Sequence, residues 1–175
     1  MVTLQDIKSY LKIDDTNTKE DSFINNLIPS SYQMFCKYVG YEILSKDYTE
    51  YYSGDYTPNL IVKHVLINSI TRLEIYGRVI DSTNYVIQGN EIILTDGTVF
   101  PLVPNQIKII YNAGYDELPD DIKELLIEFI GIRYKYRDNI NVLSMGNSHT
   151  RTTYEQDSIP DKIRKLLFFH RRVSC

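Results

Sequence analysis

The 175-residue sequence contains no tryptophan, only two cysteines and only eight glycines. Cys36 and Cys175 are too few for a disulfide framework or a cysteine-rich metal site. The glycines stand singly in expected turns, and the P-loop and dinucleotide-binding motifs are absent, so no glycine-rich phosphate cradle is predicted. No stretch approaches the roughly 20 consecutive apolar residues of a transmembrane helix. These absences predict a protein without a disulfide framework, a nucleotide-binding loop or a membrane span.

Residues with the spacing of a catalytic or metal site are also missing. The three histidines, His64, His149 and His170, are not three or four positions from another histidine or a cysteine. Glu124 and Glu128 are four positions apart, but a solvated helix face explains them better than acid–base chemistry. We therefore expect no enzyme, no cofactor and no metal, although carboxylates that are dispersed in the sequence can still converge in the fold.

Charge and aromatic content suggest which partners the chain has. Nineteen basic and 23 acidic residues give a net charge of -4, which argues against a dedicated DNA-binding module. The first residues show neither the basic nor the apolar region of a signal peptide, so we expect synthesis in a reducing cytoplasm. Fifteen tyrosines are the unusual feature. They are suited to partly wet interfaces, and codon bias in an AT-rich genome is the alternative explanation.

The hydrophobic pattern predicts an α+β fold: a mainly α-helical bundle with an inserted small antiparallel β-sheet and a C-terminal helical arm. Helices are expected over residues 3–13, 18–39 and 119–137, with Pro29 kinking or splitting the second one. Short strands separated by turns predict a β-meander over 46–111, including a hairpin at Asp96-Gly97. Together these elements are expected to make one core over residues 1–138.

The C-terminal part is expected to differ from the core. Residues 139–157 lack periodicity and are predicted to be a flexible loop. Residues 158–175 form a short helical arm with an apolar stripe and basic flanks. This arm either folds back on its own domain or docks on another subunit.

The order of features along the chain resembles one protein family. The stretch from Thr3 to Asp14 is followed by a long helix, and the element Tyr111-Asn112-Ala113-Gly114-Tyr115 precedes a helix that begins at Leu118-Pro119. Near the end, the stretch from Ile159 to Leu167 precedes Arg171 and Arg172. This order is similar to that of the head–tail connector (adaptor) proteins of long-tailed phages and gene transfer agents.

The resemblance implies a structural virion protein at the head–tail junction, involved in head completion and DNA packaging. About a dozen copies would form a ring under the portal protein. The ring would extend the DNA channel, let genomic DNA pass without sequence-specific binding, and attach a neck stopper or tail-completion protein. No cofactor and no membrane are involved. Another neck component, a stopper or tail-completion protein, is the alternative, and a small nucleic-acid-binding regulator is a further one.

Two kinds of surface follow from this hypothesis. The arm is the candidate portal contact, through Ile163, Arg164, Lys165, Leu166, Leu167, Arg171 and Arg172. A cyclic assembly also needs two different faces on each subunit. The candidate subunit interfaces are Tyr48, Tyr51, Tyr52 and Tyr56 in the sheet region, and Arg133, Tyr134, Tyr136 and Arg137 at the end of the third helix.

Overall fold

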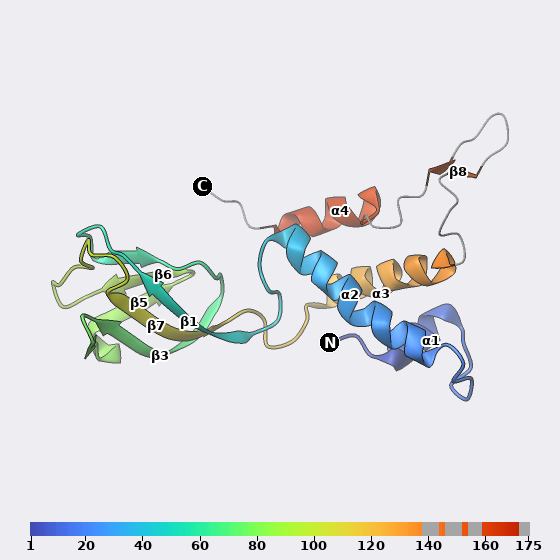
Figure 1. Cartoon of the computed structure of the whole chain (residues 1–175), viewed down its shortest axis with the longest axis horizontal. Helices are drawn as coiled ribbons and strands as arrows, with labels where there is room; N and C mark the ends of the chain where they lie inside the picture. Colours follow the sequence, from blue (N-terminus) through green and yellow to red (C-terminus); the bar gives the residue numbers. More distant parts are fainter. Residues whose placement is uncertain (138–143, 146–151, 154–158, 172–175) are drawn as a thin grey trace. The chain divides into compact units, whose positions relative to one another are not determined.

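The computed structural model describes residues 1–137, 144–145, 152–153 and 159–171 (Figure 1). Its contacts divide the chain into two compact units. We call residues 1–40 together with the described residues from 118 onwards the helical unit, and residues 41–117 the sheet unit. The expected α+β class is confirmed. The loop predicted at 139–157 lies outside the described residues, apart from the short strands β8 (Ser144–Met145) and β9 (Thr152–Thr153).

The helical unit contains α1 (Leu4–Leu11), α2 (Asp21–Val39), α3 (Asp120–Lys135), α4 (Asp161–Leu167) and the 3₁₀ turn η3 (Phe168–His170). Thr3 begins α1 with a capping box, because its hydroxyl accepts from the Asp6 N–H and the Asp6 carboxylate accepts from the Thr3 N–H. Gly40 ends α2 in the left-handed conformation. The expected helices therefore exist, each with slightly shorter bounds.

Pro29 does not split α2, contrary to one of the expected outcomes. The helix is assigned without interruption from Asp21 to Val39. Pro29 lies on the exposed side, whereas Ile28 and Tyr32 are buried on the other side. The missing N–H therefore affects the solvent side of the helix, and the packing of the buried side maintains the helix across it.

The core of the helical unit lies around α3, which contacts α1, α2 and α4. The rings of Phe35 in α2 and Phe129 in α3 stack with centroids 5.6 Å apart, and both side chains are buried. Ile122, Leu126 and Ile130 continue the buried stripe along α3 at helical spacing. The apolar residues whose spacing predicted α3 are thus the residues that it buries.

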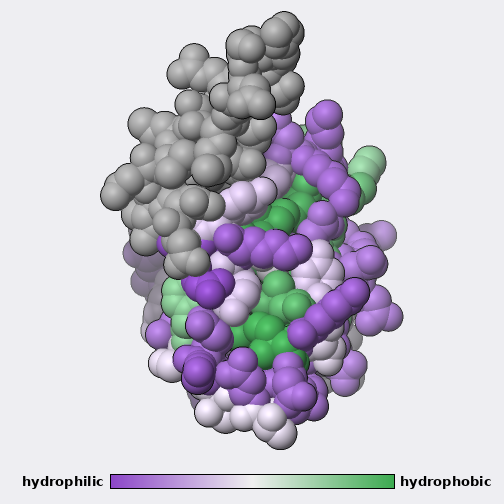
Figure 2. All heavy atoms as spheres, turned by 90° about the vertical axis from the view of Figure 1, so that its right-hand side faces the viewer, coloured by the Kyte–Doolittle hydropathy of each residue, from purple (hydrophilic) through white to green (hydrophobic). Residues whose placement is uncertain are grey.

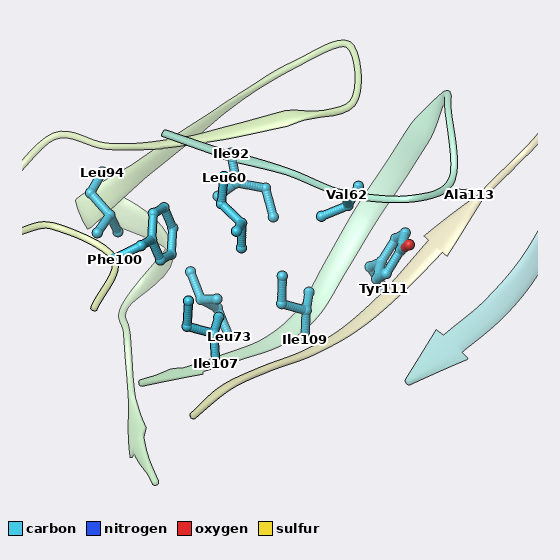
Figure 3. Packing of buried hydrophobic residues seen from close by; sticks show 10 residues of the cluster. All are labelled: Leu60, Val62, Leu73, Ile92, Leu94, Phe100, Ile107, Ile109, Tyr111 and Ala113. Carbon is cyan, nitrogen blue, oxygen red and sulfur yellow. The ribbon is translucent and has the colours of Figure 1, made fainter. Parts of the chain in front are cut away.

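The sheet unit is built from two antiparallel sheets. One sheet has the order β1-β7-β3-β4 and the other β2-β6-β5. Their buried side chains form one apolar cluster that includes Ile92, Phe100, Ile109 and Tyr111 (Figure 3). The strands are β1 (Lys46–Tyr52), β2 (Asn59–Ile61), β3 (Ile67–Ile75), β4 (Arg78–Val79), β5 (Tyr85–Gln88), β6 (Glu91–Leu94) and β7 (Ile107–Ala113), with the 3₁₀ turn η1 (Ser82–Asn84) before β5.

Two expectations about this region are wrong. The strands pair antiparallel as predicted, but β7 lies between β1 and β3, so the order is not that of a simple meander. The hairpin predicted at Asp96-Gly97 does not form either. The Phe100 N–H donates to the Thr57 carbonyl at 2.8 Å, and the Tyr56 N–H donates to the Phe100 carbonyl at 2.9 Å. Phe100 is fully buried, so core packing draws its segment to the chain that follows β1 rather than back onto β6.

Gly114, in the element Tyr111-Asn112-Ala113-Gly114-Tyr115, lies where two segments approach closely. Its φ is +117°, and a Cβ atom added there would lie 2.7 Å from the Leu44 carbonyl oxygen. The neighbouring backbone is joined by hydrogen bonds from the Ser45 N–H to Tyr115 and from the Tyr115 N–H to Ile43. This position therefore requires glycine for both its conformation and its lack of a side chain.

Replacing Gly114→Ala is expected to lower the free energy of unfolding by about 2–4 kcal/mol, because the substitution combines left-handed strain with a backbone clash. The matched control is Gly97→Ala, whose φ is +81° but which has open space around it. It should lose only about 1 kcal/mol. Chemical denaturation measures both values, and equal losses would contradict the close approach at Gly114.

Candidate interaction surfaces

Helix α4 packs on its own helical unit. Ile163 and Leu167 are fully buried there. Beside them, Lys162 Nζ lies 2.9 Å from Glu128 Oε1 and His170 Nε2 lies 2.7 Å from Asp121 Oδ2. These two contacts align α4 antiparallel to α3. Of the two alternatives for the arm, the described residues adopt the fold-back arrangement.

On the α2 side, α4 is held by a second set of contacts. The Tyr38 hydroxyl donates to the Arg164 carbonyl at 3.0 Å, and the Arg171 guanidinium lies 6.0 Å from the centre of the Tyr38 ring. Arg164 also pairs with Asp161 within α4. Docking on both α2 and α3 fixes which side of α4 points away from the unit.

The outer side of α4 and η3 is both apolar and basic. The exposed fractions of Leu166, Phe168 and Phe169 are 45%, 56% and 84%. Lys165 and Arg171 are exposed as well, whereas the predicted arm residue Arg172 lies outside the described residues. A portal contact through this segment remains a prediction, and it would use the outer side because Ile163 and Leu167 are buried.

The Arg133–Arg137 end of α3 packs against α2 and the chain before it. Arg133 donates through Nη1 to the hydroxyls of Ser30 and Ser31, both at 2.8 Å. The Tyr134 ring lies against Phe23, with centroids 6.3 Å apart. The other two predicted residues are also partly covered: the Arg137 guanidinium lies 4.1 Å from the centre of the Tyr134 ring and 3.7 Å from the Glu20 carboxylate, and Tyr136 is half-buried. The predicted interface here remains untested.

The predicted tyrosine cluster divides into two groups by orientation. Tyr51 and Tyr56 have exposed fractions of 55% and 64%, so they are available to a partner. Tyr48 and Tyr52 are half-buried and pack against the core of the sheet unit. Within β1, the alternation of side chains separates Tyr51 from Tyr48 and Tyr52, because neighbouring residues point to opposite faces of a strand. Tyr56 lies in the segment that follows β1.

Glu50 is the polar centre that the inward-facing tyrosines surround, and sequence analysis did not single it out. Its carboxylate accepts from the Tyr111 hydroxyl at 2.6 Å and also from the Tyr52 hydroxyl. His64 Nε2 lies 3.4 Å from Glu50 Oε1, and the His64 ring stacks on Tyr48 with centroids 3.6 Å apart. The available signal was the alternation of Tyr48, Glu50 and Tyr52, which places the carboxyl on the tyrosines' face.

Hydrogen bonding determines the protonation of this network. Burial alone would raise the pKa of Glu50, but hydrogen bonds from Tyr111 and Tyr52 and the charge of His64 outweigh it, so the pKa lies below its ordinary value of 4.5. Burial and the bond to Glu50 raise the pKa of Tyr52 to about 12, and the same two causes raise the pKa of Tyr111. The arrangement stabilises an ionised carboxylate that is held by neutral phenols, which suits a structural role.

The described residues contain no cluster of three metal-ligating side chains and no helix long and apolar enough to cross a membrane. Glu128 pairs with Lys162, while Glu124 remains exposed. Asp14 accepts from the N–H of Thr16 at 2.9 Å, which is turn chemistry. On the face shown in Figure 2, hydrophilic residues surround small apolar groups.

Comparison with models of protein families shows the class to which this chain belongs. The model of the head completion protein family (HCP) matches residues 1–173. The chain therefore belongs to the head completion protein family, a family of virion structural proteins. This membership confirms the resemblance to phage connector proteins on which the sequence hypothesis rested. No curated protein sequence matches the chain.

Solved structures with the same fold come from gene transfer agent (GTA) particles. A chain in the neck of an empty GTA particle, computed with C6 symmetry, has a TM-score of 0.65 and 12% identity, covering 99% of this chain and 91% of the other. A chain in the virion of a native GTA particle gives 0.59 and 12%, with the same coverage. A chain in the neck of a native GTA particle, computed with C12 symmetry, gives 0.55 and 11%, covering 100% and 94%. At these identities the likeness establishes the fold.

The docking of α4 predicts a difference between neighbouring leucines. Leu167→Ala is expected to destabilise the protein by about 2–4 kcal/mol, because it leaves a cavity between α4 and the helices beneath it. Leu166→Ala removes the same atoms from an exposed position and should change the stability by less than about 0.5 kcal/mol. Equal effects in thermal unfolding would show that α4 is not docked in this orientation.

The network around Glu50 predicts a loss of stability at alkaline pH. Because the pKa of Tyr52 is raised from 10.0 to about 12 in the folded state, its contribution is complete below pH 10 and is lost as the pH rises towards 12. Thermal unfolding between pH 9 and 11.5 should show this loss, and Tyr52→Phe should reduce it. The control is Tyr76→Phe at an exposed position. A Tyr52→Phe curve parallel to that of the unmodified protein would refute the assignment.

Proposed function

We propose that the chain is a head–tail connector, or adaptor, whose copies form a ring of about a dozen members under the portal. The ring extends the DNA channel and gives a neck stopper or tail-completion protein its attachment site. The observation that carries the proposal is the family match over nearly the whole chain. A fold similar to chains of symmetric GTA necks supports the location and the ring.

The composition supports a passive role towards DNA. With a net charge of -4, the chain lacks the excess of cations that holds phosphates tightly, so genomic DNA slides through the channel without being bound. We infer that the protein acts through binding surfaces alone, as a non-enzymatic part of the virion without a cofactor. Tight, salt-sensitive binding of duplex DNA by the purified chain would contradict this role.

Particles made without the chain distinguish a connector from a stopper. If the chain is the connector, particles made without it should accumulate as portal-bearing heads, and these heads should recruit neither the stopper nor tails. If it is itself the stopper, the adaptor should still be present on those heads and DNA should leak from filled heads. Composition analysis of the purified heads, together with a nuclease-protection assay, separates the two outcomes.

The portal contact is proposed to use the outer side of α4 and η3, where Lys165, Phe169 and Arg171 are exposed. The double variant Lys165→Glu/Arg171→Glu should reduce binding to purified portal rings about tenfold or more, because it reverses two charges without touching the buried side of α4. Co-sedimentation measures the bound fraction. The control is Lys19→Glu/Lys63→Glu, which reverses two exposed charges elsewhere. Unchanged binding by the α4 variant would exclude this surface.

A further inference from the structure

Helix α4 separates two hollows of opposite charge on the helical unit. On its α2 side lies a hollow of about 520 Å³ lined by Met34, Lys37, Tyr38, Ile159 and Arg164. On its α3 side lie two adjoining hollows of about 330 and 640 Å³ that share Glu124, Glu128 and Lys162. We call the first the basic hollow and the joined pair the acidic groove.

The acidic groove carries more negative charge than its own bases neutralise. Its lining contains two lysines and one histidine against five carboxylates, those of Asp6, Asp120, Asp121, Glu124 and Glu128. Lys123 pairs with Asp6, Lys162 with Glu128 and His170 with Asp121. Asp120 and Glu124 remain exposed beside these pairs, together with the apolar surfaces of Tyr10, Leu166 and Phe169.

The basic hollow has the complementary composition. Lys37 is exposed on α2, and the exposed Arg164 lies on the flank of α4 that contacts Tyr38. Met34 and Ile159 contribute apolar lining. Arg164 also pairs with Asp161 in the first turn of α4. Both hollows thus combine apolar surface with a net charge, and the two net charges have opposite signs.

We propose that the acidic groove of one copy receives the basic flank of the next copy, so that α4 lies between two subunit contacts. This inference rests on the ring proposed above and names the faces that close it. Two different, complementary faces on one subunit can make the heterologous contact that a closed ring requires. Opposite charges also set the direction in which the copies join.

Charge reversal tests the contact on purified portal rings, with the number of bound copies measured by native mass spectrometry. Lys37→Glu and Glu124→Lys should each lower the number of complete rings on the portal about tenfold, because each places like charges at every contact between copies. Neither residue belongs to the proposed portal contact. Lys19→Glu, which changes an exposed lysine outside both hollows, is the control and should assemble normally.

Mixing the two single variants gives the sharper result. In a ring where the two variants alternate, half of the contacts pair Lys37 of one copy with Glu124 of the next, and the other half pair the introduced glutamate with the introduced lysine. Assembly should therefore return to near the unmodified level, with equal numbers of the two variants. The double variant Lys37→Glu/Glu124→Lys should also assemble. Folding of each variant is confirmed by thermal unfolding.

The outcomes separate this inference from the proposed function. Failure of both the mixture and the double variant, with the unmodified chain still binding as a ring, would overturn the contact and leave the connector role intact. Normal assembly by both single variants would do the same. If the unmodified chain does not join portal rings at all, both proposals fail. If Glu124→Lys assembles normally but no longer binds a neck or tail protein, the groove serves that partner instead of a second copy.

Discussion

The packing of α3 against α1, α2 and α4 is the constraint on which the helical unit depends. It joins parts of the chain that are separated by the whole sheet unit, so no local propensity can replace it. The stacked rings of Phe35 and Phe129 and the fully buried Ile130 and Leu126 form the centre of this contact. Helices as short as α1 and α4 are only marginally stable in isolation. They are helical here because they pack on the surface that α2 and α3 provide.

The same packing gives α4 its two roles. Its buried side, with Ile163 and Leu167, attaches it to the unit, and its ion pairs with α3 fix its direction. The outer side is consequently presented in one orientation, with basic residues on one flank and the acidic groove on the other. Of the two alternatives for the arm, the fold-back arrangement therefore makes α4 part of the surface of the helical unit.

The elements could be predicted from the sequence because they follow local rules. The capping box at Thr3 indicates where α1 begins, and the proline before α3, the paired acids in its first turn and its apolar stripe indicate α3. Strand positions followed from turns and alternation. The order of the strands could not be predicted, because the burial of Phe100 and the placement of β7 are decided by contacts distant in sequence. The network at Glu50 was missed for the same reason: Tyr111 and His64 reach it from other segments.

The chain enters and leaves the sheet unit through two adjacent backbone segments. Leu44 and Tyr115 form a bridge, and Gly114 allows the two backbone segments to touch, so both connections lie side by side. Because the two connections are adjacent, the helices have to bring only these two backbone segments together, whatever the length of the chain between them. We therefore expect insertions or deletions between Ser45 and Gly114 to leave the packing of the helices unchanged.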